Sequence, residues 1–355
     1  MKEIKKDPFD EYIKNLPPSR KELGQAWSAA IGLQDVDGLK PSEYLYDTAK
    51  KSIDGEITID EAGKLINSYY ESKDRRTDVE SRTEEADKVS ARIAKLLSER
   101  AFTFSPAQYI SIHKELFAGI YSHAGKIRDY NITKKEWVLN GDTVSYGGAY
   151  NLRETLDYDF SQEREFRYNG LTMDETIHHL SVFVSRLWQI HVFGEGNTRT
   201  TAVFFIKYLR MLGFDAENDL FADNSWYFRN ALVRANYTNL KEGIYETTEF
   251  LELFLRNLLL DEKNELHNRA MHVSGKFLLG HDDPINDPKD DPINLSEKEK
   301  QILNLLKEKS DYTRKDMAER LGYSDSTIKR CLQNLVDKGV LKRIGSNRKG
   351  EWVIK

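Results

Sequence analysis

The chain has 355 residues, of which 39% are hydrophobic and 31% charged, and its formal net charge is −5. This length exceeds what one hydrophobic core usually organises, and the composition excludes a disordered or fibrous chain, so we expect a main domain with smaller appendages. No apolar run approaches the roughly 20 residues of a membrane span. The N-terminus lacks the apolar segment of a secretory signal, and the single cysteine, Cys331, excludes an internal disulfide. We therefore expect a cytoplasmic protein with no membrane partner.

Charge is unevenly divided along the chain. Residues 295–355 carry 15 Lys/Arg and 9 Asp/Glu, a net charge of +6 that leaves −11 for the remainder. The C-terminal part is therefore expected to meet a different partner from the rest.

Capping patterns mark two helix starts near the N-terminus. Ser19 with Glu22, after Pro17-Pro18, and Thr58 with Glu61 fit the capping box, in which each side chain satisfies a free backbone N–H of the other residue. These patterns predict a small helical unit within residues 1–78.

Apolar residues recur at helical spacing through most of residues 79–275, which predicts a mainly α-helical main domain. Ser105-Pro106 supplies a cap and a first-turn proline, and helices are predicted over 172–190, 197–212, 222–236 and 247–260. Residues 137–139 and 143–146 flank Asn140-Gly141-Asp142. Because Asn-Gly readily supplies the positive backbone angles of a tight turn, this segment predicts a short β-hairpin.

The C-terminal part is set apart by the segment that precedes it. Residues 276–294 contain prolines and acids without an apolar face, which is typical of a linker. Three short amphipathic helices and a hairpin with a basic tip follow, and they predict a winged helix-turn-helix over 295–355.

The loop between the two central helices concentrates polar and glycine residues, His191-Val192-Phe193-Gly194-Glu195-Gly196-Asn197-Thr198-Arg199. The N–H groups of Gly196, Asn197 and Thr198 would converge at a helix N-terminus, where phosphate binds well, and the glycines, Gly194 included, let it approach. This arrangement predicts a phosphate site. A tight interhelical turn with a buried histidine is the structural alternative.

The remaining side chains of this loop fit nucleotidyl transfer. Glu195 suits a Mg²⁺ ion held by one protein carboxylate and phosphate oxygens, and Arg199 can clamp a phosphate through its forked donors. His191 has an ordinary pKa near 6.5, which suits removal of a proton from an attacking Ser, Thr or Tyr hydroxyl. A P-loop lysine and a third dinucleotide-type glycine are both missing.

The loop resembles the Fic-family motif H-P-F-x-[DE]-G-N-G-R-x-x-R, and Ala124-Gly125-Lys126-Ile127-Arg128 with Asn131-Ile132 resembles the segment before that family's flap. The resemblance covers about residues 85–260. It implies a helical Fic core that moves AMP from ATP to a protein hydroxyl, with His191 as base and Glu195 on Mg²⁺. It also implies a hairpin flap that aligns the target by backbone pairing, comprising Leu139, Asn140, Gly141, Asp142, Thr143 and Val144.

Three positions depart from the family motif. Val192 replaces the proline, and Thr198 replaces the second glycine while keeping its backbone N–H. Ala202 stands where the resemblance places the second arginine, which grips the terminal phosphate and pairs with an inhibitory glutamate. The transferred group and the mode of regulation therefore stay open.

The N-terminal unit resembles the small antitoxin domain of some Fic proteins, whose inhibitory motif is [ST]-x-x-x-E-[GN]. The aligned positions are Leu33 and Asp37-Gly38, so the hydroxyl is absent and the carboxylate is one methylene shorter. We keep Asp37 and Gly38 as candidate inhibitory residues. Ser81 with Glu85 is a second match, but its helix has an ordinary charged composition, so we interpret Glu85 as part of a solvated face.

Other conspicuous residues have a structural and a functional interpretation. His178 and His179 are expected to be structural, because no further ligand follows at metal spacing. Trp226, Tyr227, Phe228 and Arg229 could line an adenine pocket, but core packing is the favoured interpretation. In the C-terminal domain, the side chains expected to face DNA are Ser326, Thr327, Lys329, Arg330, Arg348 and Lys349.

The leading hypothesis is a protein adenylyltransferase that uses ATP and Mg²⁺ and modifies a protein target, with self-modification included. The alternatives are a DNA-binding regulator whose Fic core senses nucleotide, and a Fic enzyme that transfers a different phosphate-containing group. For the winged helix, the alternative to DNA contact is docking on another protein, which includes formation of a homodimer.

Overall fold

The computed structural model describes residues 8–72, 78–216, 219–274, 297–308, 312–337, 341–344 and 351–354. The predicted linker at 276–294 and the wing-tip residues Arg348 and Lys349 lie outside these ranges. Contacts divide the chain into two units, Met1–Lys289 and Asp290–Lys355. Among the described residues, no helix is both long enough and apolar enough to cross a membrane.

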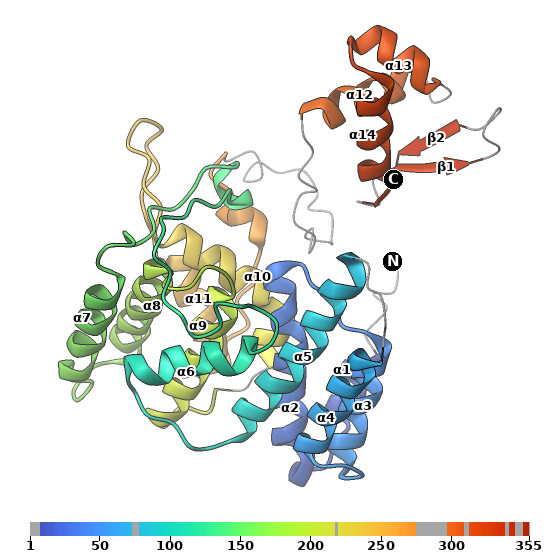
Figure 1. Cartoon of the computed structure of the whole chain (residues 1–355). Helices are drawn as coiled ribbons and strands as arrows, with labels where there is room; N and C mark the ends of the chain where they lie inside the picture. Colours follow the sequence, from blue (N-terminus) through green and yellow to red (C-terminus); the bar gives the residue numbers. More distant parts are fainter. Residues whose placement is uncertain are drawn as a thin grey trace. The chain divides into compact units, whose positions relative to one another are not determined.

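The N-terminal elements of the first unit are short helices (Figure 1): α1 (Pro8–Lys14), α2 (Pro18–Gly32), the 3₁₀ helix η1 (Leu33–Asp37), α3 (Glu43–Asp54) and α4 (Ile59–Glu71). The Thr58–Glu61 capping box is confirmed at the start of α4. The Ser19–Glu22 box is wrong. Pro17 is the N-cap residue of α2 and makes no side-chain cap, because Pro18 begins the helix and places Ser19 inside its first turn.

The remaining elements of the first unit follow the N-terminal helices along the chain (Figure 1). They are α5 (Asp78–Ser98), α6 (Pro106–Phe117), η2 (Trp137–Leu139), α7 (Leu152–Glu165), α8 (Met173–Ile190), α9 (Asn197–Met211), α10 (Asp219–Arg234), α11 (Glu249–Leu260) and η3 (Asn268–Met271). Ser105 caps α6 as expected, through its hydroxyl and the Gln108 N–H. The mainly helical fold class is thus confirmed.

The structure corrects the prediction of a β-hairpin at 137–146. All of residues 136–147 are described, and they form no strand pair; η2 is followed by Asn140 and Gly141 at positive φ. Consecutive Val138 and Leu139 are both buried, whereas a strand of a half-buried hairpin would turn every second side chain to solvent. The tight turn is present without the strands that it was expected to join.

The N-terminal helices pack directly on the core of the first unit. α2 lies against α5 and α10 (Figure 1), and the backbones come so close that a Cβ on Gly32 would lie 2.3 Å from the Ala222 carbonyl oxygen. Ser225 donates a hydrogen bond to the Gly32 carbonyl. One hydrophobic core therefore runs from Phe9 to Met271.

The second unit has its own small core. Its elements are α12 (Glu297–Glu308), α13 (Arg314–Leu321), α14 (Asp325–Asp337), and the antiparallel strands β1 (Leu341–Ile344) and β2 (Glu351–Ile354). Thr313 caps α13 with Asp316, and Gly322 ends that helix in the left-handed conformation. Three helices followed by a strand pair confirm the winged helix-turn-helix.

Candidate active site

The loop from His191 to Gly196 begins and ends with a residue in the left-handed conformation. α8 ends at Ile190, and His191 follows at φ 52°. Gly196 precedes α9 at φ 75°, and a Cβ there would lie 2.4 Å from the Phe117 ring. A glycine is therefore required at 196 by both backbone and space. The first turn of α9 follows at once, with backbone N–H groups that a helix leaves without intrahelical partners.

His191 is buried and oriented to accept a proton. Its side chain packs against the rings of Tyr146 and Trp188, and the residue is 3% exposed. Nδ1 lies 3.3 Å from the Trp188 carbonyl oxygen, which assigns the proton to Nδ1 and the lone pair to Nε2. Nε2 is buried and has no hydrogen-bond partner among the described residues. Burial, reinforced by the charge of Lys134, holds the pKa of His191 well below its usual range, so the imidazole is neutral at pH 7.

Arg128 holds the backbone of the segments that meet at His191. Its guanidinium donates to the carbonyl oxygens of His191 at 2.7 Å, Tyr130 at 2.5 Å and Gly147 at 2.5 Å. The backbone N–H of Arg128 donates to the Val192 carbonyl oxygen. The arginine is 4% exposed and therefore acts as an internal clamp.

Asn197 and Thr198 support the loop through their side chains. The Asn197 amide exchanges two hydrogen bonds with the Phe193 backbone, accepting at 3.0 Å and donating at 2.8 Å. The Trp188 indole N–H, which comes from α8, donates to the Thr198 hydroxyl at 3.0 Å. What both residues offer a phosphate is therefore their backbone N–H.

His113 is a supporting residue that the sequence reasoning did not find. Its ring stacks on Phe193 at 3.7 Å, accepts from the Gly125 N–H, and lies 3.0 Å from the Glu195 carbonyl oxygen. Because Nδ1 accepts, Nε2 carries the proton and donates to that carbonyl. Burial lowers the pKa of His113 to about 4. A histidine at a buried helical position carries no sequence signal that distinguishes this role from ordinary packing.

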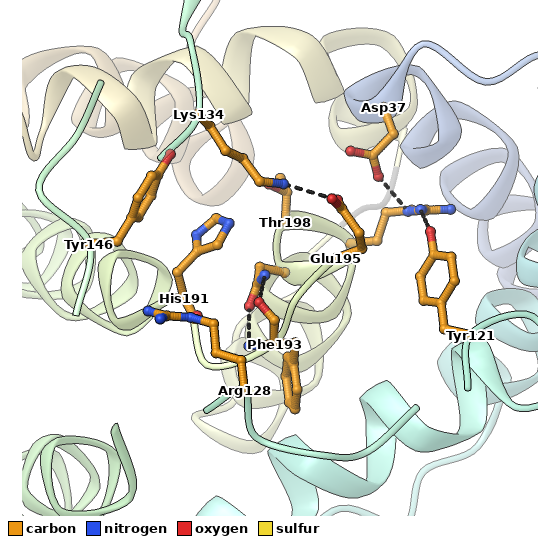
Figure 2. A network of polar contacts seen from close by, with 12 residues as sticks. Asp37, Tyr121, Arg128, Lys134, Tyr146, His191, Phe193, Glu195 and Thr198 are labelled. Carbon is orange, nitrogen blue, oxygen red and sulfur yellow. Dashed lines mark hydrogen bonds and ion pairs between the residues drawn. The ribbon is translucent and has the colours of Figure 1, made fainter. Parts of the chain in front are cut away.

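Arg199 is enclosed by groups from the N-terminal helices and α5. Its Nε lies 2.7 Å from Asp37 Oδ2, its Nη2 lies 2.6 Å from Glu85 Oε1, and its Nη1 donates to Gln34 Oε1 at 3.0 Å. Tyr121 donates to the same Glu85 oxygen, and Arg199 Nη2 donates to the Tyr121 hydroxyl at 3.3 Å (Figure 2). Burial alone would lower the pKa of Arg199, but Asp37, Tyr121 and Glu85 more than offset this and raise it.

The environment of Glu85 corrects an expectation. Its side chain is 17% exposed and paired with a buried arginine, so it does not belong to a solvated face. The charged composition of α5 concealed this, because composition does not reveal which face of a helix meets another segment. Asp37 also contacts Arg199, whereas Gly38 ends η1 in the left-handed conformation and its carbonyl accepts from Arg82.

Glu195 lies at the open side of the loop, where its side chain is 55% exposed. Its Oε2 is 3.0 Å from Nζ of Lys134, which extends past the His191 ring toward it (Figure 2). No cluster of three or more metal-ligating side chains occurs in the described part of the chain. A divalent ion would therefore need phosphate oxygens beside the single Glu195 carboxylate, which is a donor set that suits Mg²⁺.

The predicted flap is a tight turn held by hydrogen bonds within it and by one to Tyr237. Leu139 and Val144 are buried, and Asn140, Gly141 and Asp142 are exposed. The Asp142 carboxylate accepts from the Tyr237 hydroxyl and the Thr143 N–H. A second contact ties this segment to the base, because Tyr146 packs on His191 and donates to buried Glu136.

The residues given a structural interpretation have partners within the protein, but the His178 side chain is 62% exposed and does not pack in the core. His178 pairs with Glu252, and His179 pairs with buried Glu163. Trp226, Tyr227 and Phe228 are at most 5% exposed, and Arg229 pairs with Glu136 at 2.8 Å.

In the second unit, α14 presents the side chains predicted to face DNA. Ser326, Lys329 and Arg330 are exposed and Thr327 is half-buried. Ser324 accepts from the Thr327 N–H at the start of this helix. Arg343 of the wing stacks on Trp352 at 4.7 Å.

Comparisons with known proteins agree with this arrangement. A family model described as Fic/DOC family matches residues 103–209, and one described as winged helix-turn-helix DNA-binding matches residues 295–342. The chain contains a Fic/DOC-family domain followed by a winged helix-turn-helix domain.

A curated relative and a solved structure are among the known proteins similar to this chain. The chain is 25% identical over 150 residues to the protein adenylyltransferase VbhT of Bartonella schoenbuchensis, which covers 42% of this chain and 28% of that protein. It thus spans less than a third of that relative's length. A Fic family protein from Desulfovibrio desulfuricans G20 shares 11% identity, with a TM-score of 0.40 over 96% of this chain and 89% of that one.

Proposed function

We propose that the Fic/DOC-family domain is a nucleotidyltransferase that moves AMP from ATP to a Ser, Thr or Tyr hydroxyl of a protein, its own chain included. The observation that carries this proposal is the buried Nε2 of His191, which has no hydrogen-bond partner among the described residues. A buried lone pair without a donor fits a base whose partner is a substrate hydroxyl. The relative named an adenylyltransferase supports the choice of group.

In the proposed reaction, the target hydroxyl gives its proton to Nε2 of His191 while its oxygen bonds to the α-phosphorus of ATP. The bond from that phosphorus to the bridging oxygen breaks, and pyrophosphate leaves. The N–H groups at the start of α9 stabilise the developing negative charge. Glu195 would hold Mg²⁺ together with phosphate oxygens, and the ion would neutralise charge on the phosphate chain. The turn at 139–144 would position the target.

Label transfer tests the proposal. The full chain is incubated with Mg²⁺ and α-labelled ATP, and protein-bound label is expected with the parent chain and abolished by His191→Ala. Label from γ-labelled ATP alone would refute AMP transfer and indicate phosphoryl transfer. Parallel reactions with labelled CTP, GTP and UTP decide whether another nucleotide is preferred, since Ala202 stands in the second arginine position.

We further propose that Asp37 and Glu85 restrain this activity by occupying Arg199. Arg199 and its two carboxylate partners together carry a net negative charge, which repels an incoming phosphate. Asp37→Asn and Glu85→Gln are expected to raise label transfer by about tenfold, which equals about 1.4 kcal/mol. Glu84→Gln is the matched control, because Glu84 lies on the same helix but pairs with Lys88. Unchanged or lower transfer in both variants would show that the contacts are structural.

A second proposed function is DNA binding by the C-terminal domain. The exposed Lys329 and Arg330 on α14 favour it, together with the family match. The full chain is expected to shift the fluorescence anisotropy of a duplex at low salt, with affinity that falls as salt rises. Lys329→Ala with Arg330→Ala should weaken binding and flatten the salt dependence. Absence of binding at low salt would favour a docking role for this domain.

A further inference from the structure

The mouth of the candidate site contains a cation that neither the Fic motif nor the proposed mechanism uses. Lys134 comes from the segment before η2, and its ammonium pairs with Glu195 Oε2 at 3.0 Å. Figure 2 shows its side chain reaching across the site, between the His191 ring and the Glu195 carboxylate. The Lys134 ammonium therefore lies between the proposed base, His191, and the proposed metal ligand, Glu195.

The other cationic side chains near His191 already have buried partners. Arg128 donates to four backbone carbonyls, and Arg229 pairs with buried Glu136. Arg199 is enclosed by Asp37 and Glu85. Lys134 differs because its partner carboxylate is 55% exposed, so exchanging that partner leaves no buried charge behind.

The neighbourhood of the ammonium favours an anion. The first turn of α9 presents its N–H groups there, and buried Nε2 of His191 has no partner among the described residues. Lys134 lies beside the His191 ring (Figure 2), and its positive charge contributes to the lowered pKa of His191. A flexible ammonium beside such groups can follow a phosphate chain as it binds.

Resting on the proposed function, we propose that Lys134 is a phosphate-binding residue of this site and supplies the cation that is missing at Ala202. On ligand binding, its ammonium exchanges the Glu195 carboxylate for oxygens of a polyphosphate chain. This exchange leaves Glu195 free for a divalent ion. The ligand class is a nucleoside triphosphate, recognised here through its phosphates and independently of its base.

Binding of inorganic tripolyphosphate to the full chain, measured calorimetrically in metal-free buffer with EDTA, tests this proposal without catalysis. Lys134→Met is expected to weaken tripolyphosphate by about tenfold, the loss typical of a charge-assisted hydrogen bond. Lys134→Arg should restore most of the affinity. Lys135→Met is the matched control, because Lys135 is the exposed neighbour on the same segment.

A second substitution separates Lys134 from general charge effects. Glu195→Gln should strengthen tripolyphosphate binding in the parent chain by releasing Lys134 and removing a repelling charge, and the gain should be several-fold smaller in the Lys134→Met background, where only the repulsion is removed. Equal gains in both backgrounds, an affinity for Lys134→Met within twofold of Lys135→Met, or no binding by the parent chain would each overturn the proposal. The result does not depend on AMP transfer, so a chain that binds tripolyphosphate through Lys134 but transfers no label refutes only the proposed function.

Discussion

Arg199 illustrates at the scale of one residue how the candidate site was only partly predictable. Its position at the start of α9 followed from the loop, but its contacts with Gln34 and Glu85 join residues 165 and 114 positions apart. Such pairs leave no pattern in a local window. The same limit hid His113, Lys134 and Tyr146, each from a segment outside the loop. The roles predicted for the loop residues stay predictions until transfer is measured.

The residue-scale prediction concerns His113 and pH. Its pKa of about 4 in the folded chain lies below the ordinary 6.5 because burial disfavours the charged ring. Below pH 6.5 the unfolded chain therefore binds a proton that the folded chain does not. The free energy of unfolding is expected to fall by on the order of 3 kcal/mol between pH 6.5 and 4 from this residue, and to be unaffected by it above 6.5.

Chemical denaturation of the parent chain and of His113→Gln across pH 7.5 to 4.5 measures this difference, since the variant lacks the titrating ring. A ring signal of His113 that titrates near 6.5 in NMR spectra would contradict the expected shift.

Individual elements were predictable where a local rule fixes them. Thr58 with Glu61, Thr313, and Ser105-Pro106 each mark a helix start by their own hydrogen bonds, and all three helices begin there. The hairpin failed because an Asn-Gly turn specifies only the turn, while burial of both Val138 and Leu139 depends on segments far along the chain. Val138, for example, accepts a hydrogen bond from the Val273 N–H.

The element-scale prediction concerns the packing of α2 on α10. Gly32→Ala should lower the free energy of unfolding by about 1–3 kcal/mol, because its Cβ meets the Ala222 backbone, which cannot move aside alone. Gly63→Ala is the control. Gly63 lies within α4 and its Cβ would meet nothing within 4 Å, so the change should stabilise by about 0.5–1 kcal/mol. Urea unfolding measures both, and equal effects at the two positions would contradict close packing at Gly32.

The whole molecule consists of two units with separate cores. The sequence predicted the winged helix as a distinct domain from a charge difference and a change in punctuation. It also suggested an N-terminal appendage, whereas the structure joins those helices and the main domain in one continuous core. Segment composition predicted the elements of this unit but not how tightly they pack together.

The prediction at this scale is that the two units can be disabled separately. Leu335 is fully buried in the smaller core, so Leu335→Ala should cost about 2–5 kcal/mol and unfold a domain whose core supplies roughly that much. DNA binding should be lost while label transfer stays within twofold of the parent chain. Val336→Ala, at an exposed neighbouring position, is the control. Loss of both activities with Leu335→Ala would contradict independent units.

The enclosure of Arg199 also has a consequence for how the chain is made. Asp37 and Glu85 leave the ribosome long before Arg199 is synthesised, since even Glu85, the later of the two, precedes it by 114 residues. Until then, two carboxylates meet where η1 packs on α5 without the cation that balances them. The N-terminal helices are therefore expected to complete this contact only late in translation. They are expected to stay open to chaperones until the start of α9 emerges and supplies the arginine.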